Sequence, residues 1–252
     1  MCKLRNWLAV LMAALALQPP IVTASVPQTM LLTGAGKGSP TAAAGFAYID
    51  GEATALGQNG GTSGTFNSVN ANLIACAVAS YSSVTVDASH VTDLETNTWT
   101  LRETQVATGS RIQLYTAQPT ASDTNANHTV TVTQTNAYAA IVCATFSGAH
   151  ATTFDLVDKG SGGGTTISPT TGITPSVANA LVVTLLSGDG AEGAVTTPTN
   201  YIIVGNVAYG GSNNFPSSLA YRILGAASAQ DPEWTTGNSL DHGTIVASFK
   251  PA

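Results

Sequence analysis

The chain has 252 residues and a mass of 25.5 kDa, and its 44% of hydrophobic residues is enough to build a folded core, which argues against a disordered chain. Only 9% of the residues are charged, and the formal net charge at pH 7 is −6. Because phosphate binding needs clustered Lys and Arg, this composition excludes nucleic acid as a partner and disfavours an anionic membrane surface.

The N-terminus has the pattern of a secretory signal segment. Lys3 and Arg5 precede an apolar run at 7–17, and small residues before position 25 fit cleavage after Ala24. The apolar run is too short to cross a bilayer, so we expect no membrane span after processing. Two alternatives stay open: residues 1–24 remain as an uncleaved arm, or Met30 is the true start.

Residues 25–64 are rich in Gly, Ala, Ser and Thr and contain few large side chains. Such a composition gives little apolar surface to bury, and it is typical of a flexible segment. We therefore predict a flexible arm over 25–64, which leads into a folded domain over 65–252.

From residue 65 onward, short β-branched and aromatic runs alternate with turn residues, which is typical of β-strands. The runs at 73–78 and 181–186 are apolar on both faces, so we expect them centrally, between sheets or under the arm. We predict an all-β fold, a two-sheet antiparallel sandwich of jelly-roll-like form. The predicted strands are 65–69, 73–81, 84–86, 98–105, 111–116, 128–135, 139–147, 165–167, 180–186, 201–207, 217–224 and 244–249.

Cysteine use leaves two hypotheses open. Cys2 would be lost with a signal segment, so that Cys76 and Cys143 remain, each within an apolar run. Free Cys commonly packs as a small hydrophobic residue, which favours a buried reduced pair. The alternative is a disulfide across two strands or between the sheets.

No pattern typical of a catalytic or metal site is present. The chain lacks a Gly-x-Ser-x-Gly element, and the glycine-rich stretch at 34–39 lacks the spacing of a phosphate-binding loop. Asp241 and His242 are adjacent, so on a strand their side chains would point to opposite faces. We predict no enzymatic activity, no cofactor and no metal. Loop carboxylates leave a glycan-degrading enzyme as a less favoured alternative, through the pairs Asp93 and Glu95, Asp155 and Asp158, Asp189 and Glu192, and Asp231 and Glu233.

Four aromatic residues are candidates for contact with a ligand or partner. Trp99 and Trp234 lie in short polar contexts, where an exposed indole could stack on a sugar ring, although a core position is the competing interpretation for both. Tyr209 and Phe215 flank a polar, glycine-rich stretch, a composition that suits adaptable recognition loops.

The run Val91-Thr92-Asp93-Leu94-Glu95-Thr96-Asn97-Thr98-Trp99-Thr100-Leu101 contains a V-x-D-x-x-x-N-x-W element. It resembles an element of β-sandwich surface and structural proteins of tailed bacteriophages and of their prophage or bacterial adhesin-like relatives. The resemblance covers the chain from about residue 67 to the C-terminus and brings no catalytic residues with it. Further stretches that resemble these proteins, in the same order, are 30–38, 114–119, 141–148, 174–183, 220–222 and 247–250.

The resemblance implies a non-enzymatic structural or adhesive component of a phage particle's surface, of decoration, fibre or adhesin type. Its partners would be other virion or surface proteins, or a host surface glycan, contacted through loops. It also implies a homo-oligomer such as a trimer. The signal pattern favours a different hypothesis, a secreted bacterial carbohydrate-binding or adhesin domain. We therefore expect the chain at a virion surface or outside the cell.

Overall fold

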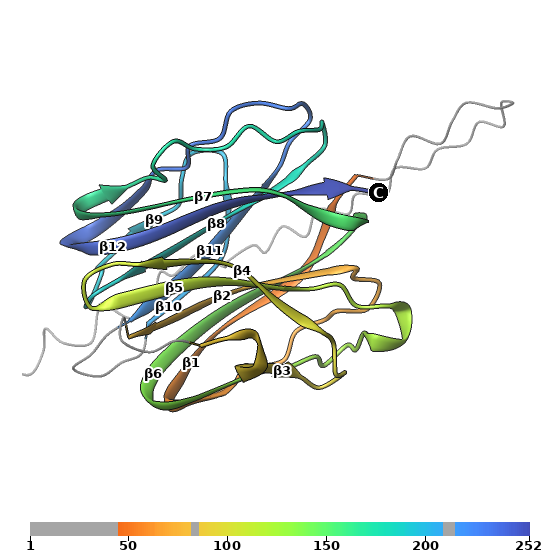
Figure 1. Cartoon of the computed structure of the whole chain (residues 1–252), viewed down its shortest axis with the longest axis horizontal. Helices are drawn as coiled ribbons and strands as arrows, with labels where there is room; N and C mark the ends of the chain where they lie inside the picture. The colour runs from red at the N-terminus through yellow and green to blue at the C-terminus, as the bar shows by residue number, and fades with distance from the viewer. Residues whose placement is uncertain (1–44, 82–85, 209–214) are drawn as a thin grey trace, which may run out of the picture. The chain divides into compact units, whose positions relative to one another are not determined.

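The computed structural model describes residues 45–81, 86–208 and 215–252. Two antiparallel sheets pack face to face, one drawn in orange to green and the other in green to blue in Figure 1. The predicted all-β, two-sheet antiparallel sandwich is confirmed. Within the described ranges, no helical segment has the length and hydropathy that crossing a bilayer requires.

The first sheet has the strand order β1-β6-β2-β5-β4, and the short strand β3 pairs with the first residues of β6. Every pairing in it is antiparallel. Its strands are β1 (Ala47–Thr62), β2 (Leu73–Tyr81), β3 (Val91–Asp93), β4 (Trp99–Val106), β5 (Ser110–Ala117) and β6 (Val130–Ser147). Two single 3-10 turns, η1 (Ala88–His90) and η2 (Ala121–Asp123), lie in its connections.

The second sheet has the order β10-β11-β8-β12-β7, and the two-residue β9 pairs with β12. Its strands are β7 (Ala149–Ile167), β8 (Leu181–Gly188), β9 (Val195–Thr196), β10 (Ile202–Ala208), β11 (Pro216–Ile223) and β12 (Trp234–Pro251). The first half of the described chain thus forms one sheet and the second half the other. This connectivity is simpler than the expected jelly-roll-like one, in which successive strands cross between the sheets.

The core between the sheets follows the two-residue period of the strands. Ala75, Ala77 and Ala79 of β2 face this core, together with Ile112 and Leu114 of β5, and all are fully buried. In the second sheet, alternate residues of β8 and β12 face the same core. They are Leu181, Val183, Leu185, Ile245, Ala247 and Phe249. Small alanines opposite larger aliphatic side chains let the two layers approach closely.

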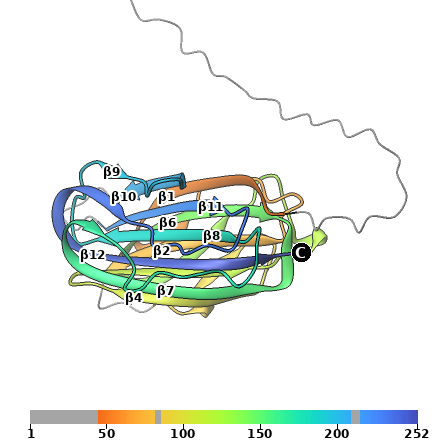
Figure 2. The same ribbon diagram turned by 90° about the horizontal axis from the view of Figure 1, so that it is seen from above.

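The outer faces of the central strands are also buried, in further apolar clusters. The alternate residues of β2, Ile74, Cys76 and Val78, pack with Trp99 and Tyr115 in a second cluster on the outer side of the first sheet. Because β2 and β8 are buried on both faces, both faces of each strand are apolar. The predicted central positions of these two strands are confirmed. Figure 2 shows the strands of the two layers running side by side over the length of the sandwich.

The predicted arm over 25–64 is wrong for its last part, because β1 occupies Ala47–Thr62. β1 is an edge strand that pairs only with β6, so backbone hydrogen bonds hold it and it needs few large side chains. Its glycines serve a close approach: at Gly60, with φ 85°, a Cβ would lie 2.0 Å from the carbonyl oxygen of Val132.

Other strand boundaries also differ from the prediction. The predicted strands 128–135 and 139–147 form one long strand, β6, while the predicted strand 65–69 contributes only an isolated bridge between Phe66 and His128. β7 runs through the glycines at 160 and 162–164, which are paired with β12 and gave no strand signal. Part of the predicted strand 84–86 lies outside the described residues.

Candidate functional site

A buried polar network lies on the outer side of the first sheet, and Asp93 at the end of β3 is its centre. One carboxylate oxygen accepts a hydrogen bond from the backbone N–H of Asn97 at 2.9 Å. The other accepts hydrogen bonds from the Asn97 side chain at 2.8 Å and from the indole N–H of Trp99 at 3.2 Å. Asp93, Asn97 and Trp99 are the three polar-contact positions of the V-x-D-x-x-x-N-x-W element. The element therefore forms a loop whose later residues, Asn97 and Trp99, donate hydrogen bonds to its own Asp93 carboxylate.

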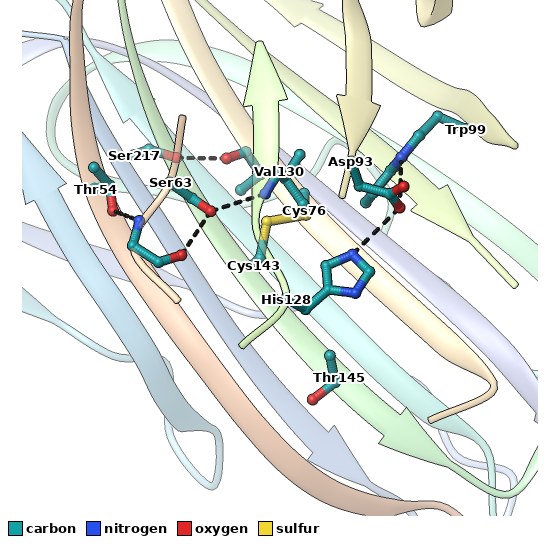
Figure 3. The surroundings of a disulfide bond; sticks show 12 residues. Thr54, Ser63, Cys76, Asp93, Trp99, His128, Val130, Cys143, Thr145 and Ser217 are labelled. Atoms are coloured by element: carbon teal, nitrogen blue, oxygen red, sulfur yellow. Dashed lines mark hydrogen bonds and ion pairs between the residues drawn. A yellow bond between two sulfur atoms is a disulfide. The ribbon is translucent and has the colours of Figure 1, made fainter. Parts of the chain in front are cut away.

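The network extends through His128 to Ser68. The His128 Nε2 atom lies 3.3 Å from Asp93 Oδ2, and Nδ1 lies 3.0 Å from the hydroxyl oxygen of Ser68. Figure 3 shows Asp93 placed between the indole of Trp99 and the imidazole of His128. Burial alone would raise the pKa of Asp93, but hydrogen bonds from His128 and Asn97 lower it overall. Because an ionised carboxylate only accepts, Nε2 carries a proton toward Asp93.

Ser68, His128 and Asp93 follow one another as in a hydrolase triad, but the two imidazole nitrogens are exchanged, since Nδ1 faces Ser68 and Nε2 faces Asp93. The site is also sealed. The side chains of His128 and Asp93 are fully buried, as is Ser68. The Ser68 hydroxyl oxygen is held by Asn125, whose backbone N–H donates to it at 2.8 Å and whose carbonyl oxygen lies at 3.1 Å. A substrate carbonyl has no path to this oxygen in the structure. The arrangement joins the loops before β2 and β6 to the loop after β3.

Three of the four predicted ligand-contact residues are buried, so that part of the prediction is wrong. Trp99 is 6% exposed and its indole donates to Asp93, while Trp234 is fully buried and its indole donates to the hydroxyl of Thr184 at 3.0 Å. Phe215 is 1% exposed and its ring lies edge-on to Tyr81. The groups that accept from the two buried indoles, Asp93 and Thr184, are not the flanking polar residues that suggested exposure. Tyr209 lies outside the described residues.

Cys76 and Cys143 form a disulfide, so the favoured hypothesis of a reduced pair is wrong. The two residues are direct partners in the β2–β6 pairing, with their Cα atoms 4.1 Å apart. The bond lies in the same outer cluster as Trp99, close to the polar network (Figure 3). It is a cross-strand bond within one sheet, and the strand register, which the sequence alone does not reveal, brings the two sulfurs together.

A second buried pair of ionisable groups lies at one end of the second sheet. The Glu192 Oε1 atom is 4.0 Å from the Nε2 atom of His242, too long for a hydrogen bond, and both side chains are almost fully buried. Burial raises the pKa of Glu192 to about 8. Burial also lowers the pKa of His242, against the opposing effects of the Leu240 backbone and Asp241. In the described part of the chain, no three His, Cys, Asp or Glu side chains gather as metal ligands.

The predicted carboxylate pair Asp155 and Asp158 holds a loop, whereas Asp231 and Glu233 both line a surface depression. Asp155 accepts hydrogen bonds from the backbone and hydroxyl of Ser176, and Asp158 accepts from the backbone N–H groups of Thr171 and Gly172. These bonds, with burial opposing them, lower the pKa of both aspartates. They fasten the connection between β7 and β8 to the sheet.

Two shallow polar depressions open on the surface of the described domain. One, of about 400 Å³, adjoins the outer side of the Asp93 loop. The other, of about 350 Å³, lies among the loops before β10 and β12 and includes Tyr201, Arg222 and Gln230. Residues lining the first are Thr96, Asn97, Thr98, Thr100, Arg102, Thr116, Gln118, Thr120 and Asp123.

The Asp93 element is visible in the sequence, but the residues around it are not. Ser68 and His128 complete the network from distant positions in the chain, and Arg102 and Gln118 line the depression beside it. The only sequence signal for this region was the D-x-x-x-N-x-W spacing itself.

Comparison of the chain with protein-family models, curated proteins and solved structures finds no match in any of the three.

Proposed function

We propose that this chain is a non-enzymatic, structural or adhesive β-sandwich on the surface of a phage particle, which contacts partner proteins or a host glycan through its loops. The observation that carries the proposal is the sealed Ser68, His128 and Asp93 network. Side chains with the order of a catalytic triad are used here to fix loops, and their burial keeps them from a substrate. The V-x-D-x-x-x-N-x-W resemblance supplies the particle setting.

Rigid loops on a sandwich suit recognition without chemistry. Asp93, Asp155 and Asp158 each hold a connection through hydrogen bonds to its backbone, so the outer surfaces of these loops are fixed before a partner arrives. A preformed surface loses less conformational entropy on binding than a mobile one. The proposal also retains a homo-oligomer, such as a trimer, as the state of the chain in the particle.

A second candidate is a secreted bacterial adhesin or carbohydrate-binding domain, and the disulfide between Cys76 and Cys143 favours it. Structural disulfides persist in oxidising surroundings and are rare in the cytosol. The signal pattern at 1–24 fits the same setting. A particle protein made in the cytoplasm would meet such surroundings only after release from the cell.

Quantitative mass spectrometry of the natural source separates the two candidates. We expect the chain to be enriched in density-purified phage particles over culture fluid and cell envelope, with an intact mass that retains Met1 or begins at Met30. A chain that starts after Ala24 and is found in the culture fluid or envelope, absent from particles, would replace the first candidate with the second. Native mass spectrometry of the same preparation measures the oligomer.

Enzymatic activity is tested separately with a fluorophosphonate probe, which labels activated serines. We expect no labelling of Ser68 in the folded chain, because its hydroxyl is buried and bonded to Asn125. Labelling of Ser68 that is lost in a His128→Asn variant would overturn the non-enzymatic proposal.

A further inference from the structure

Arg102 occupies an irregular position on an edge strand. The β4–β5 register shifts between Leu101 and Glu103, so that Arg102 is the extra residue of a β-bulge. Bulges change the direction of a side chain and are frequent beside functional sites. Here the bulge places Arg102 in the lining of the 400 Å³ depression beside the Asp93 loop.

The guanidinium of Arg102 is held in place without a counter-charge. Its Nε atom donates a hydrogen bond to the hydroxyl of Thr116 at 2.7 Å, and its Cζ atom lies 4.9 Å from the centre of the Phe154 ring. None of the ion pairs within the described ranges includes it. Burial of the side chain lowers the pKa of Arg102, with no carboxylate to oppose this effect. The side chain is only partly buried and lines the depression, so an anionic ligand there could reach the guanidinium.

The rest of the depression presents hydroxyl and amide groups on fixed walls. Asn97 is bonded to Asp93 and to the carbonyl oxygen of Asp123, and the Gln118 amide donates to the carbonyl oxygen of His150. The carboxylate of Asp123 accepts hydrogen bonds from Thr120 and Ser122, which lower its pKa. Such groups suit a polyhydroxylated ligand, because each sugar hydroxyl both donates and accepts.

We propose that this depression binds an acidic saccharide, with the guanidinium of Arg102 holding the sugar carboxylate and the surrounding threonine and Gln118 side chains meeting its hydroxyls. Guanidinium and carboxylate match as a bidentate pair, which is the reason to favour a uronic or sialic acid over a neutral sugar. The inference rests on the proposed function, since it names the class of host glycan that the loops would contact.

Titration calorimetry with the full oxidised chain tests the inference. The probes are tetragalacturonate and, as the neutral match, maltotetraose. We expect tetragalacturonate to bind at least about tenfold more tightly than maltotetraose, and Arg102→Gln to remove this preference. Arg102→Lys keeps the charge but loses the planar guanidinium over Phe154, so it should bind with intermediate affinity. Arg222→Gln, in the other depression, is the matched control and should bind like the natural chain.

A second variant keeps the test independent of folding at Arg102. Gln118 is exposed, so Gln118→Ala should fold as the natural chain does and weaken tetragalacturonate binding several-fold. Equal affinity for the acidic and neutral oligosaccharides, unchanged binding by Arg102→Gln and Gln118→Ala, or competition by sulfate as effective as by galacturonate would each overturn the inference. None of these results would alter where the chain is found, so a failure here is distinguishable from a failure of the particle-surface proposal.

Discussion

Asp93 shows how one carboxylate determines the conformation of a whole connection. Its two oxygens accept hydrogen bonds from Asn97, Trp99 and His128 in the buried site. Hydrogen bonds to a charged, buried acceptor are stronger than neutral ones, and a lost partner leaves the others unsatisfied. The stability of the outer cluster should therefore depend on this side chain more than on any neighbouring residue of the loop.

The first prediction concerns the variant Asp93→Asn. Its amide places a donor against the donors of Asn97 and Trp99, so we expect the free energy of unfolding to fall by about 3 kcal/mol and Tm by roughly 5–10 °C. Urea titration followed by circular dichroism measures the change. Thr92→Ala, at the exposed neighbouring position, is the control and should stay within about 0.5 kcal/mol. Equal stabilities of the two variants would contradict the role assigned to Asp93.

Glu192 leads to a pH prediction. Its pKa of about 8 in the folded chain exceeds the ordinary value of 4.5, so between these values the native state binds more protons than the unfolded state and stability falls as pH rises. His242, with its lowered pKa, has the opposite effect, but only below its ordinary pKa of 6.5. Between pH 6.5 and 8 the Glu192 effect remains alone. We expect a loss on the order of 1–2 kcal/mol over that interval.

Glu192→Gln provides the comparison for that slope. The amide has nearly the same shape and does not ionise, so the decrease between pH 6.5 and 8 should disappear in urea titrations at a series of pH values. Asp189→Asn, on the same loop, should keep the slope of the natural chain. Parallel curves for the natural chain and Glu192→Gln would show that the buried carboxyl does not titrate in this range.

The residue scale also shows the limit of prediction from sequence. The D-x-x-x-N-x-W spacing could be found, because Asp93, Asn97 and Trp99 are close along the chain. Ser68 and His128 could not, since 35 residues separate His128 from Asp93 and only the β3–β6 pairing joins them. The indoles of Trp99 and Trp234 were predicted as ligand contacts because polar neighbours suggest exposure. In the structure both are buried, and their N–H groups donate to Asp93 and to Thr184, which lie farther away along the chain.

At the scale of elements, residue alternation predicted the strands with one buried face, and composition failed for the rest. β2 and β8 were predicted as central because both of their faces are apolar, and both are buried throughout apart from Tyr81. β1 and the middle of β7 were missed, because edge strands rich in Gly, Ala and Thr are held by backbone bonds that leave no hydrophobic pattern. Register, which pairs Cys76 with Cys143, depends on the whole sheet.

The disulfide predicts a change in stability at this scale. It closes a segment with a sequence separation of 67 residues between two adjacent strands of the first sheet. Chain-entropy reasoning gives about 4 kcal/mol as the upper value for such a loop, so we expect the reduced chain to unfold with a free energy lower by about 2–4 kcal/mol. Urea titrations of oxidised chain and of chain refolded with a phosphine reductant measure the difference. Both thiols are buried, so reduction requires prior unfolding.

Two variants make the disulfide test specific. The double variant Cys76→Ala and Cys143→Ala should be destabilised with or without reductant, and Cys2→Ser should behave as the natural chain in both conditions. Alkylation of two thiols besides that of Cys2 in the denatured, unreduced chain would contradict the bond itself.

At the scale of the molecule, the two sheets depend on each other. Each half of the described chain builds one sheet, but the largest apolar cluster draws side chains from both halves. The sheets also meet along one edge, where Gly205 of β10 approaches Ala53 of β1 so closely that an added Cβ would lie 2.6 Å away. Neither sheet can bury its inner face alone, which predicts a single cooperative transition despite the simple division of the sequence.

Folding kinetics can test this cooperativity, because each sheet contains a buried tryptophan. Trp99 begins β4 in the first sheet and Trp234 begins β12 in the second. In a Trp7→Phe background, Trp99→Phe and Trp234→Phe leave one probe per sheet. Pairings such as Ala47 with Ser147 and Ala149 with Pro251 join distant positions, so we expect slow refolding, on the millisecond-to-second scale. Each substitution removes an indole hydrogen bond and so lowers the stability. The refolding rates are therefore compared at urea concentrations that lie equally far below each variant's own unfolding midpoint.

We expect both probes to report the same refolding rate constant in stopped-flow fluorescence, because the core between the sheets forms only when both are present. A brief unfolding pulse before refolding keeps prolines in their native isomers and separates their slower phases from the main one. Two different rate constants under these conditions, one for each tryptophan, would show that the halves fold one after the other. The core between the sheets would then form when one preformed sheet docks on the other. Before docking, the stability of the first sheet would depend on its outer cluster, with Asp93 and the disulfide.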